Sequence, residues 1–227
     1  MRPPGFFFFP LTFPFFLALV LFALLVFVLI EINVIGYAYE RIGIHQRYIF
    51  LVLLLSLVGS YINIPVAQFP AEQLRAEREV AYFGMRYVIP VIENWPQMLL
   101  TVNVGGAVIP TILSLYLLVH NELYVQSLAG IFIVALVTHW VASPLAGVGI
   151  TVPVFLPPVV AAFTAVVLSR HSAPSLAYIA GSLGTLIGAD LLNLDKVRGL
   201  GAPVVSIGGA GTFDGIFLAG IFAVLLA

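Results

Sequence analysis

The chain has 227 residues, of which 62% are hydrophobic and only 8% charged, and its 9 basic and 10 acidic side chains leave a formal net charge of -1. A soluble domain of this size cannot bury so much apolar surface, and nucleic-acid binding would need concentrated positive charge. The absence of cysteine excludes disulfides and thiolate metal sites. Composition therefore predicts an integral membrane protein whose partner is the lipid bilayer, with no nucleic acid, metal or cofactor.

Apolar runs long enough to cross a bilayer define the expected elements. About 20 helical residues span a hydrocarbon core of about 30 Å. Such runs lie near 11–35, 48–67, 97–119, 124–142, 148–169, 174–194 and 204–227. We expect an all-α, polytopic helix bundle of about seven transmembrane spans, with broken glycine- and proline-containing helices, that forms one domain over residues 1–227. Gly208, Gly209 and Gly211 are expected to interrupt the last run.

The sizeable polar segment, 68–96, is predicted to be an amphipathic, interfacial loop with a short surface helix at 71–80. With seven spans and a cytoplasmic N-terminus, six Lys and Arg residues would lie on the cytoplasmic side of the membrane and three on the outer side. This bias predicts a cytoplasmic N-terminus and places the connection 195–198 in the cytoplasm.

Helix-breaking residues gather within particular spans. Asn63 and Pro65 lie late in the second span, Asn103, Gly105 and Gly106 lie in the third, and three prolines lie in the fifth. Irregular backbone at membrane depth is tolerated where it is buried in protein or lines a cavity. These residues are therefore candidates for lining a polar cavity.

Small residues have two further patterns. Gly181, Ser182, Gly184 and Gly188 form a face on the sixth span that suits close helix contact. The segment 102–107, Val-Asn-Val-Gly-Gly-Ala, also resembles 205–210, Val-Ser-Ile-Gly-Gly-Ala. Paired glycine-interrupted segments can indicate a repeat whose broken helices meet at a binding site, although a chance match is the alternative.

Two aspartates in apolar, glycine-rich sequence are the candidate catalytic residues. Asp190 lies in Gly-Ala-Asp-Leu-Leu-Asn-Leu and Asp214 follows Gly211 and Thr212. An aspartate at membrane depth costs about 2.5–3.5 kcal/mol on insertion scales and usually marks a functional site. The short connection between Asn193 and Pro203 predicts an antiparallel hairpin that brings both carboxylates to one depth. Neighbouring carboxylates share a proton and can act as general acid and base.

The blocks at 63–65, 103–110, 188–194 and 207–218 resemble an uncharacterised prokaryotic multi-pass membrane family, a domain of unknown function. This resemblance implies the plasma (inner) membrane of a prokaryote and brings no activity.

A weaker resemblance is to the Gly-x-Gly-Asp intramembrane aspartyl proteases, the presenilin and prepilin-peptidase group. It implies that Asp190 matches the first catalytic aspartate and Asp214 the second. Two residues, Thr212 and Phe213, stand here between the glycine motif and the aspartate, where that group has none.

Three functions therefore remain open. An intramembrane aspartyl protease would use Asp190 and Asp214 on a membrane peptide substrate. A small ion- or proton-coupled transporter or channel, with a homodimer among its expected forms, would line its pathway with polar residues. A non-catalytic accessory subunit would belong to a larger membrane complex. The residues expected to line the site are Asn63, Asn103, Gly105, Gly106, Asn193, Gly208, Gly209, Gly211 and Thr212. In the structural alternative, Asp190 ends a helix and Asp214 caps the last one.

Overall fold

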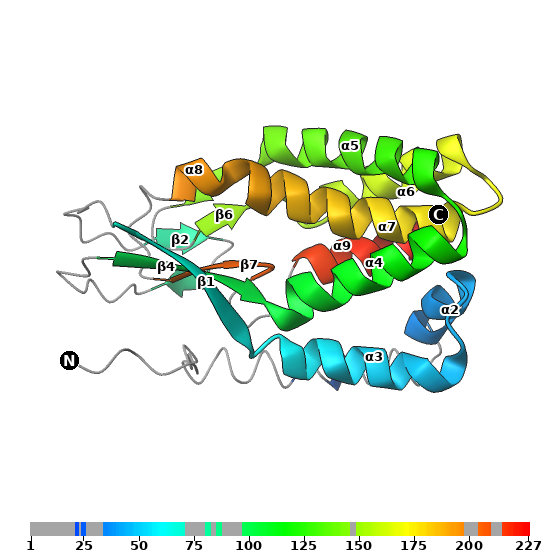
Figure 1. Cartoon of the computed structure of the whole chain (residues 1–227), viewed down its shortest axis with the longest axis horizontal. Coiled ribbons are helices and arrows are strands. Elements are labelled where there is room, and N and C mark those ends of the chain that lie inside the picture. The colour runs from blue at the N-terminus through cyan, green and yellow to red at the C-terminus, as the bar shows by residue number, and fades with distance from the viewer. Residues whose placement is uncertain are drawn as a thin grey trace.

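The computed structural model describes residues 21–22, 24–25, 34–70, 80–82, 85–87, 97–145, 149–197, 204–209 and 215–227. These residues form a bundle of apolar helices with a small β-sheet at one end (Figure 1). The helices are α2 (Val34–Arg41), α3 (Gln46–Gly59), α4 (Ile109–His120), α5 (Tyr124–Val141), α6 (Leu156–Leu168), α7 (Ala173–Thr185), α8 (Leu194–Val197) and α9 (Gly215–Leu226). Two π-helical turns, η1 (Val104–Val108) and η2 (Leu186–Asp190), and a 3-10 turn, η3 (Leu191–Asn193), adjoin them.

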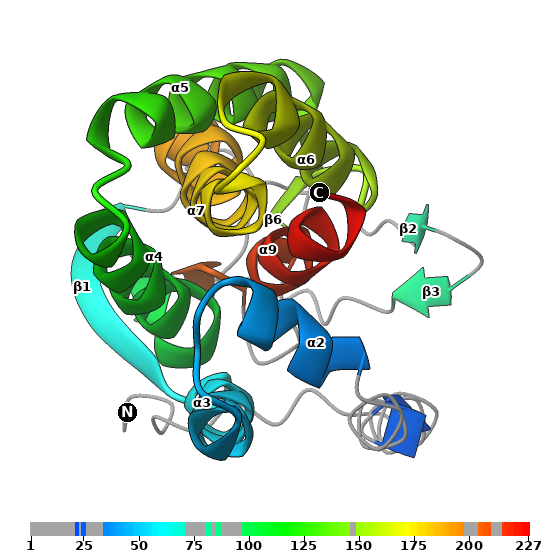
Figure 2. The same cartoon turned by 90° about the vertical axis from the view of Figure 1, so that its right-hand side faces the viewer.

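Helix α7 is the central element, and α4, α5, α6 and α9 pack around it (Figure 2). Almost every residue of α7 is buried. The neighbouring helices approach α7 closely at its glycines, which lack a Cβ. A Cβ added at Gly184 would lie 2.6 Å from Cβ of Val134 on α5, and a Cβ added at Gly181 would lie 2.9 Å from the carbonyl oxygen of Ala219 on α9. The predicted small-residue face is therefore confirmed at these two positions.

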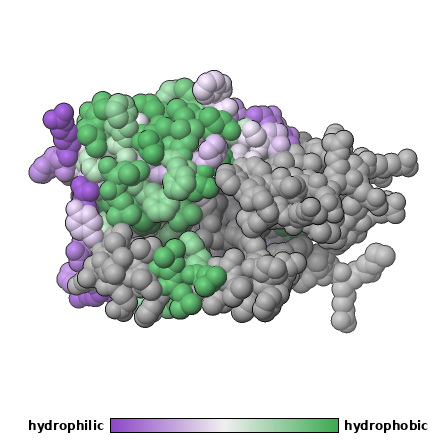
Figure 3. Space-filling model, turned by 180° about the vertical axis from the view of Figure 1, so that it is seen from behind, coloured by the Kyte–Doolittle hydropathy of each residue, from purple (hydrophilic) through white to green (hydrophobic). Residues whose placement is uncertain are grey.

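One end of the bundle, here called the loop end, consists of the connections 42–45, 121–123 and 169–172 together with the C-terminus (Figure 1). Exposed polar and charged side chains gather there, among them Arg47, Glu122, Arg170 and His171. Hydrophilic colour borders the apolar surface at this end (Figure 3).

The opposite end, here called the sheet end, contains a three-stranded sheet of order β1-β4-β7. Strand β4 (Gln97–Asn103) runs antiparallel to β1 (Asn63–Pro70) and parallel to β7 (Val204–Ile207). Two separate hairpins pair β2 (Val80–Tyr82) with β3 (Met85–Tyr87) and β5 (Ser143–Leu145) with β6 (Gly149–Thr151).

The register gives the sheet two different faces. Asn63 pairs with Asn103, and Thr101 pairs with Ser206, so these polar side chains share one face. The other face is apolar, and its residues Leu100 and Ile207 pack with Leu186 of η2 and Ile216 of α9. The apolar face therefore joins the sheet to the central helix and to α9.

The sheet corrects the expectation that all regular structure is helical. Four predicted spans, 48–67, 97–119, 148–169 and 204–227, each include strand residues, which belong to β1, β4, β6 and β7 respectively. Helix α3 ends at Gly59, before Asn63, and Pro65 has no N–H to donate to a helix. Asn103 ends β4 and is the N-cap of η1, because its side chain accepts from the backbone nitrogen of Gly106, so the helical stretch begins only after this residue.

Two helical stretches are long and apolar enough to cross a membrane: α5, with 18 residues, and the continuous stretch Ala173–Val197, with 25. The outer face of α5 is apolar along its whole length, with Val125 78%, Phe132 66% and Trp140 86% exposed. The remaining apolar helices are shorter.

Candidate functional site

Asp190 occupies the last position of the π-helical turn η2, where the central helix reaches the sheet end. Its Oδ2 atom accepts a hydrogen bond of 2.7 Å from the backbone nitrogen of Gly208, and the side chain is half-buried. Its Oδ1 accepts no hydrogen bond from any residue that the structure describes. Asp190 therefore joins the central helix to the backbone that follows β7.

Asn193 stabilises the irregular turn that carries Asp190. Its Nδ2 donates to the carbonyl oxygens of Gly188 and Ala189, at 2.8 and 2.9 Å, and its Oδ1 accepts from Nζ of Lys196 at 2.7 Å. The side chain is 0% exposed. A π-helical turn disrupts the regular backbone hydrogen bonds, and this amide satisfies two of the affected carbonyls.

Gly208 and Gly209 form a tight turn at the end of β7. Both have left-handed backbone, with φ of 83° and 82°, and the nitrogen of Gly209 donates to the oxygen of Ser206 at 3.3 Å. A Cβ on Gly208 would lie 2.7 Å from the nitrogen and from the Cβ of Ala107. Glycine is thus required at Gly208 for two reasons, its backbone angle and its contact with η1.

Asn103 connects the helices to the sheet. Its Oδ1 accepts from the nitrogen of Gly106 at 2.7 Å and so caps η1, while its Nδ2 donates to the oxygen of Ser60 at 2.6 Å. The same Nδ2 donates to Oδ1 of Asn63 at 3.1 Å, and that oxygen also accepts from Oγ of Ser206 at 2.6 Å. A hydrogen-bonded polar row therefore crosses all three strands.

Gly105 has a packing role. A Cβ there would overlap the backbone of Ser56 and Ser60 on and beside α3, so glycine lets the turn η1 lie against that helix. Gly106 contributes its backbone N–H to the Asn103 cap.

The structure thus brings together many of the predicted site residues. Asp190 meets Gly208, and Asn63 meets Asn103; Asn193 supports the turn of Asp190. Asp214, Gly211 and Thr212 lie outside the described residues, as does most of the predicted interfacial loop 68–96.

The two similar segments lie side by side as the parallel strands β4 and β7. Their pairing is offset by two residues from the sequence match, because Val102 pairs with Ile207 and not with Val205. Strand β4 leads through η1 into α4, and β7 is the strand that precedes α9 along the chain.

Sequence reasoning missed Ser60, Ser206 and Lys196. The spacing of Asn193 and Lys196, three residues apart on a helical stretch, could have indicated their contact. Ser60 and Ser206 join the polar row through long-range contacts that carry no local signal.

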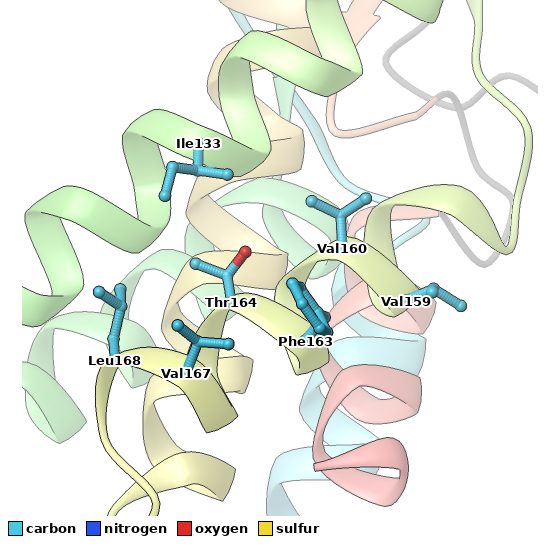
Figure 4. A pocket seen from close by; sticks show the side chains of 7 residues that line it. All are labelled: Ile133, Val159, Val160, Phe163, Thr164, Val167 and Leu168. Atoms are coloured by element: carbon cyan, nitrogen blue, oxygen red, sulfur yellow. The ribbon is translucent and has the colours of Figure 1, made fainter.

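A groove of about 360 Å³ lies on the outer surface between α5 and α6, lined by apolar side chains and Thr164 (Figure 4). None of the predicted site residues lines it. A second, open depression of about 420 Å³ lies at the loop end beside Glu40 and His45. Among the described residues, no three His, Asp or Glu side chains gather where they could hold a metal ion.

Comparison with known proteins gives a family without an assigned activity. No curated protein matches the chain, and no solved structure does. The model of one family, described as "Protein of unknown function (DUF1614)", matches residues 57–226, which include the sheet, the central helix and α9. The chain therefore belongs to the DUF1614 family.

Proposed function

We propose that this protein is an integral membrane aspartyl protease in which Asp190 and Asp214 form the catalytic pair. One observation carries the proposal: Oδ2 of Asp190 accepts a hydrogen bond from the nitrogen of Gly208 at 2.7 Å. Gly208 opens the glycine segment that leads to Asp214 in sequence. The bond therefore attaches the first aspartate to the segment that carries the second.

The surface of the bundle supports membrane embedding. Outward-facing residues of α5 recur at helical spacing and are all apolar, from Val125 through Leu128, Phe132 and Leu136 to Trp140. A contiguous exposed stripe of this kind is unfavourable in water but suited to lipid. Tyr124 and Trp140 lie near the two ends of α5, as aromatic residues do at the two membrane surfaces.

The chemistry requires two carboxyl groups that share one proton. The ionised carboxylate takes a proton from water as the water oxygen attacks the peptide carbonyl carbon, while the protonated carboxyl donates to the carbonyl oxygen. When the intermediate collapses, the C–N bond breaks, the carboxyl that took the water proton gives it to the departing nitrogen, and the other carboxylate recovers its proton from a hydroxyl group of the intermediate. Oδ1 of Asp190, which accepts no hydrogen bond from the described part of the chain, is the atom proposed for this exchange, since Oδ2 is held by Gly208.

A structural role for Asp190 is the second candidate, and the same hydrogen bond favours it. The carboxylate satisfies a backbone N–H at the end of β7, which would be useful in a non-catalytic subunit. Asparagine separates the two roles because its side-chain oxygen can still accept from Gly208 but cannot exchange a proton.

The test is labelling by a photoreactive peptide analogue that carries a hydroxyl group in place of the scissile carbonyl, a mimic of the tetrahedral intermediate. We expect the wild-type protein in lipid vesicles to be labelled, and Asp190→Asn and Asp214→Asn to lose labelling while keeping wild-type thermal stability. Asp195→Asn is the matched control, because Asp195 is an exposed residue of α8. Equal labelling of all four proteins would refute the catalytic pair.

A further inference from the structure

We infer that the candidate site lies just beneath the membrane surface at the sheet end, so that its substrate is a membrane-spanning peptide cut near one end of its span. This inference rests on the proposed function and concerns which bond the site can reach.

The length of the central helical stretch gives a first estimate of how deep Asp190 lies in the membrane. The stretch begins at Ala173, directly after the exposed Arg170 and His171, and reaches the exposed Asp195 and Lys196. At 1.5 Å per residue, Ala173 to Lys196 covers roughly 35 Å, slightly more than a hydrocarbon core of about 30 Å. Asp190 precedes Lys196 by six residues, which places it about 9 Å from the charged end.

Exposed side chains locate the boundary more closely. Leu191 and Leu192 are 42% and 49% exposed, whereas Asp195 and Lys196 are the next exposed residues along the chain. Exposed leucines are favourable in the lipid hydrocarbon, whereas exposed charged side chains are favourable at the membrane surface. The hydrocarbon boundary therefore falls between Leu192 and Asp195, just beyond Asp190.

The lengths of the shorter helices give a second estimate of this depth. Helix α9 has 12 residues and α6 has 13, and both run from the sheet end to the loop end (Figure 1). At about 1.5 Å per residue, these helices are only about 18–20 Å long. Measured from the loop end, they stop about 10 Å short of the opposite surface of a core about 30 Å thick.

This depth matters for the reaction. A peptide bond at the centre of a substrate helix is protected by hydrogen bonds on both sides, whereas the terminal turn of a helix already lacks partners for its last carbonyls. Exposing a bond near the end therefore disrupts fewer hydrogen bonds in lipid, where each unsatisfied group is costly. Water for hydrolysis also has a short path from the nearby surface.

The first test uses reporter peptides with a single apolar span of about 20 residues between lysine flanks. A panel of such spans with different sequences is incubated with the full-length protein in vesicles, and the products are read by mass spectrometry. We expect cuts within about six residues of a flank. Four leucines added at the centre should leave the distance from cut to flank unchanged.

Asp190→Asn in the same vesicles is the control for contaminating proteases. Cuts at the centre of the span that depend on Asp190 would overturn the inference and leave the proposed function standing. No Asp190-dependent cut, together with no labelling by the hydroxyl analogue, would overturn the proposed function.

The second test needs no activity. The chain has no cysteine, so single cysteines can be introduced without background. We expect Lys196→Cys and Arg170→Cys to react with a membrane-impermeant maleimide from opposite sides, and Leu192→Cys to react only after the membrane is dissolved. Reaction of Leu192→Cys as fast as Lys196→Cys in intact membranes would place the boundary elsewhere and overturn the inference.

Discussion

The carboxylate of Asp190 and the backbone nitrogen of Gly208 lie 2.7 Å apart, and this bond joins the irregular end of the central helix to the turn that follows the parallel strand β7. Both partners sit on irregular backbone, a π-helical turn and a left-handed glycine turn. Such backbone persists when surrounding contacts hold it, and it is frequent at functional sites.

Replacing Asp190 should separate stability from chemistry. We expect Asp190→Ala to lower the free energy of unfolding by about 1–3 kcal/mol, because a buried backbone N–H loses its acceptor. Asp190→Asn should stay near the wild-type value, since it retains an acceptor oxygen. Unfolding in mixed detergent micelles measures both, and equal stability of the two variants would show that the bond contributes little.

Gly208 should tolerate no side chain. Gly208→Ala combines a left-handed φ with a Cβ only 2.7 Å from Ala107, so we expect a loss of at least about 1–3 kcal/mol. Gly215→Ala is the matched control, since a Cβ there meets no atom of the described residues within 4 Å. Comparable thermal stability of the two variants would argue against the turn geometry described here.

Asn193 should be required for the turn that carries Asp190. Asn193→Leu removes the two hydrogen bonds to the carbonyl oxygens of Gly188 and Ala189, each worth about 0.5–1.5 kcal/mol. Asn121→Ala, which removes a single bond to the oxygen of Leu117, should have a smaller effect. Thermal unfolding of both variants measures which loses more stability. A larger loss for Asn121→Ala than for Asn193→Leu would contradict this prediction.

The polar row across the sheet predicts a graded series. Asn63→Leu removes the acceptor for both Asn103 and Ser206, whereas Ser206→Ala removes only one of these bonds. We therefore expect the first variant to lose more stability, by about 0.5–1.5 kcal/mol for the additional bond. Amide hydrogen exchange in β4 and β7 should rise in the same order. A larger effect of Ser206→Ala would mean that Asn63 is not the shared acceptor.

Local sequence patterns located several parts of this protein correctly. Composition indicated a mostly helical, apolar chain, and hydrophobic runs marked the positions of α5 and of the central stretch Ala173–Val197. Spacing of small residues identified where α7 meets its neighbours, because side-chain size at helical spacing is a local property. The chemistry of Asn63, Asn103 and Asp190 marked them as candidates because polar groups are costly in apolar surroundings.

Strand pairing is where those patterns failed. Short, largely apolar stretches such as 97–103 and 204–207 fit a buried strand or a membrane helix equally well, and only pairing between distant segments distinguishes the two. Sequence alone determined which residues have an unfavourable free energy of burial. The tertiary structure decided their partners, Asn103 with Asn63 and Asp190 with Gly208, because hydrogen bonds between segments depend on register and packing that no local pattern specifies.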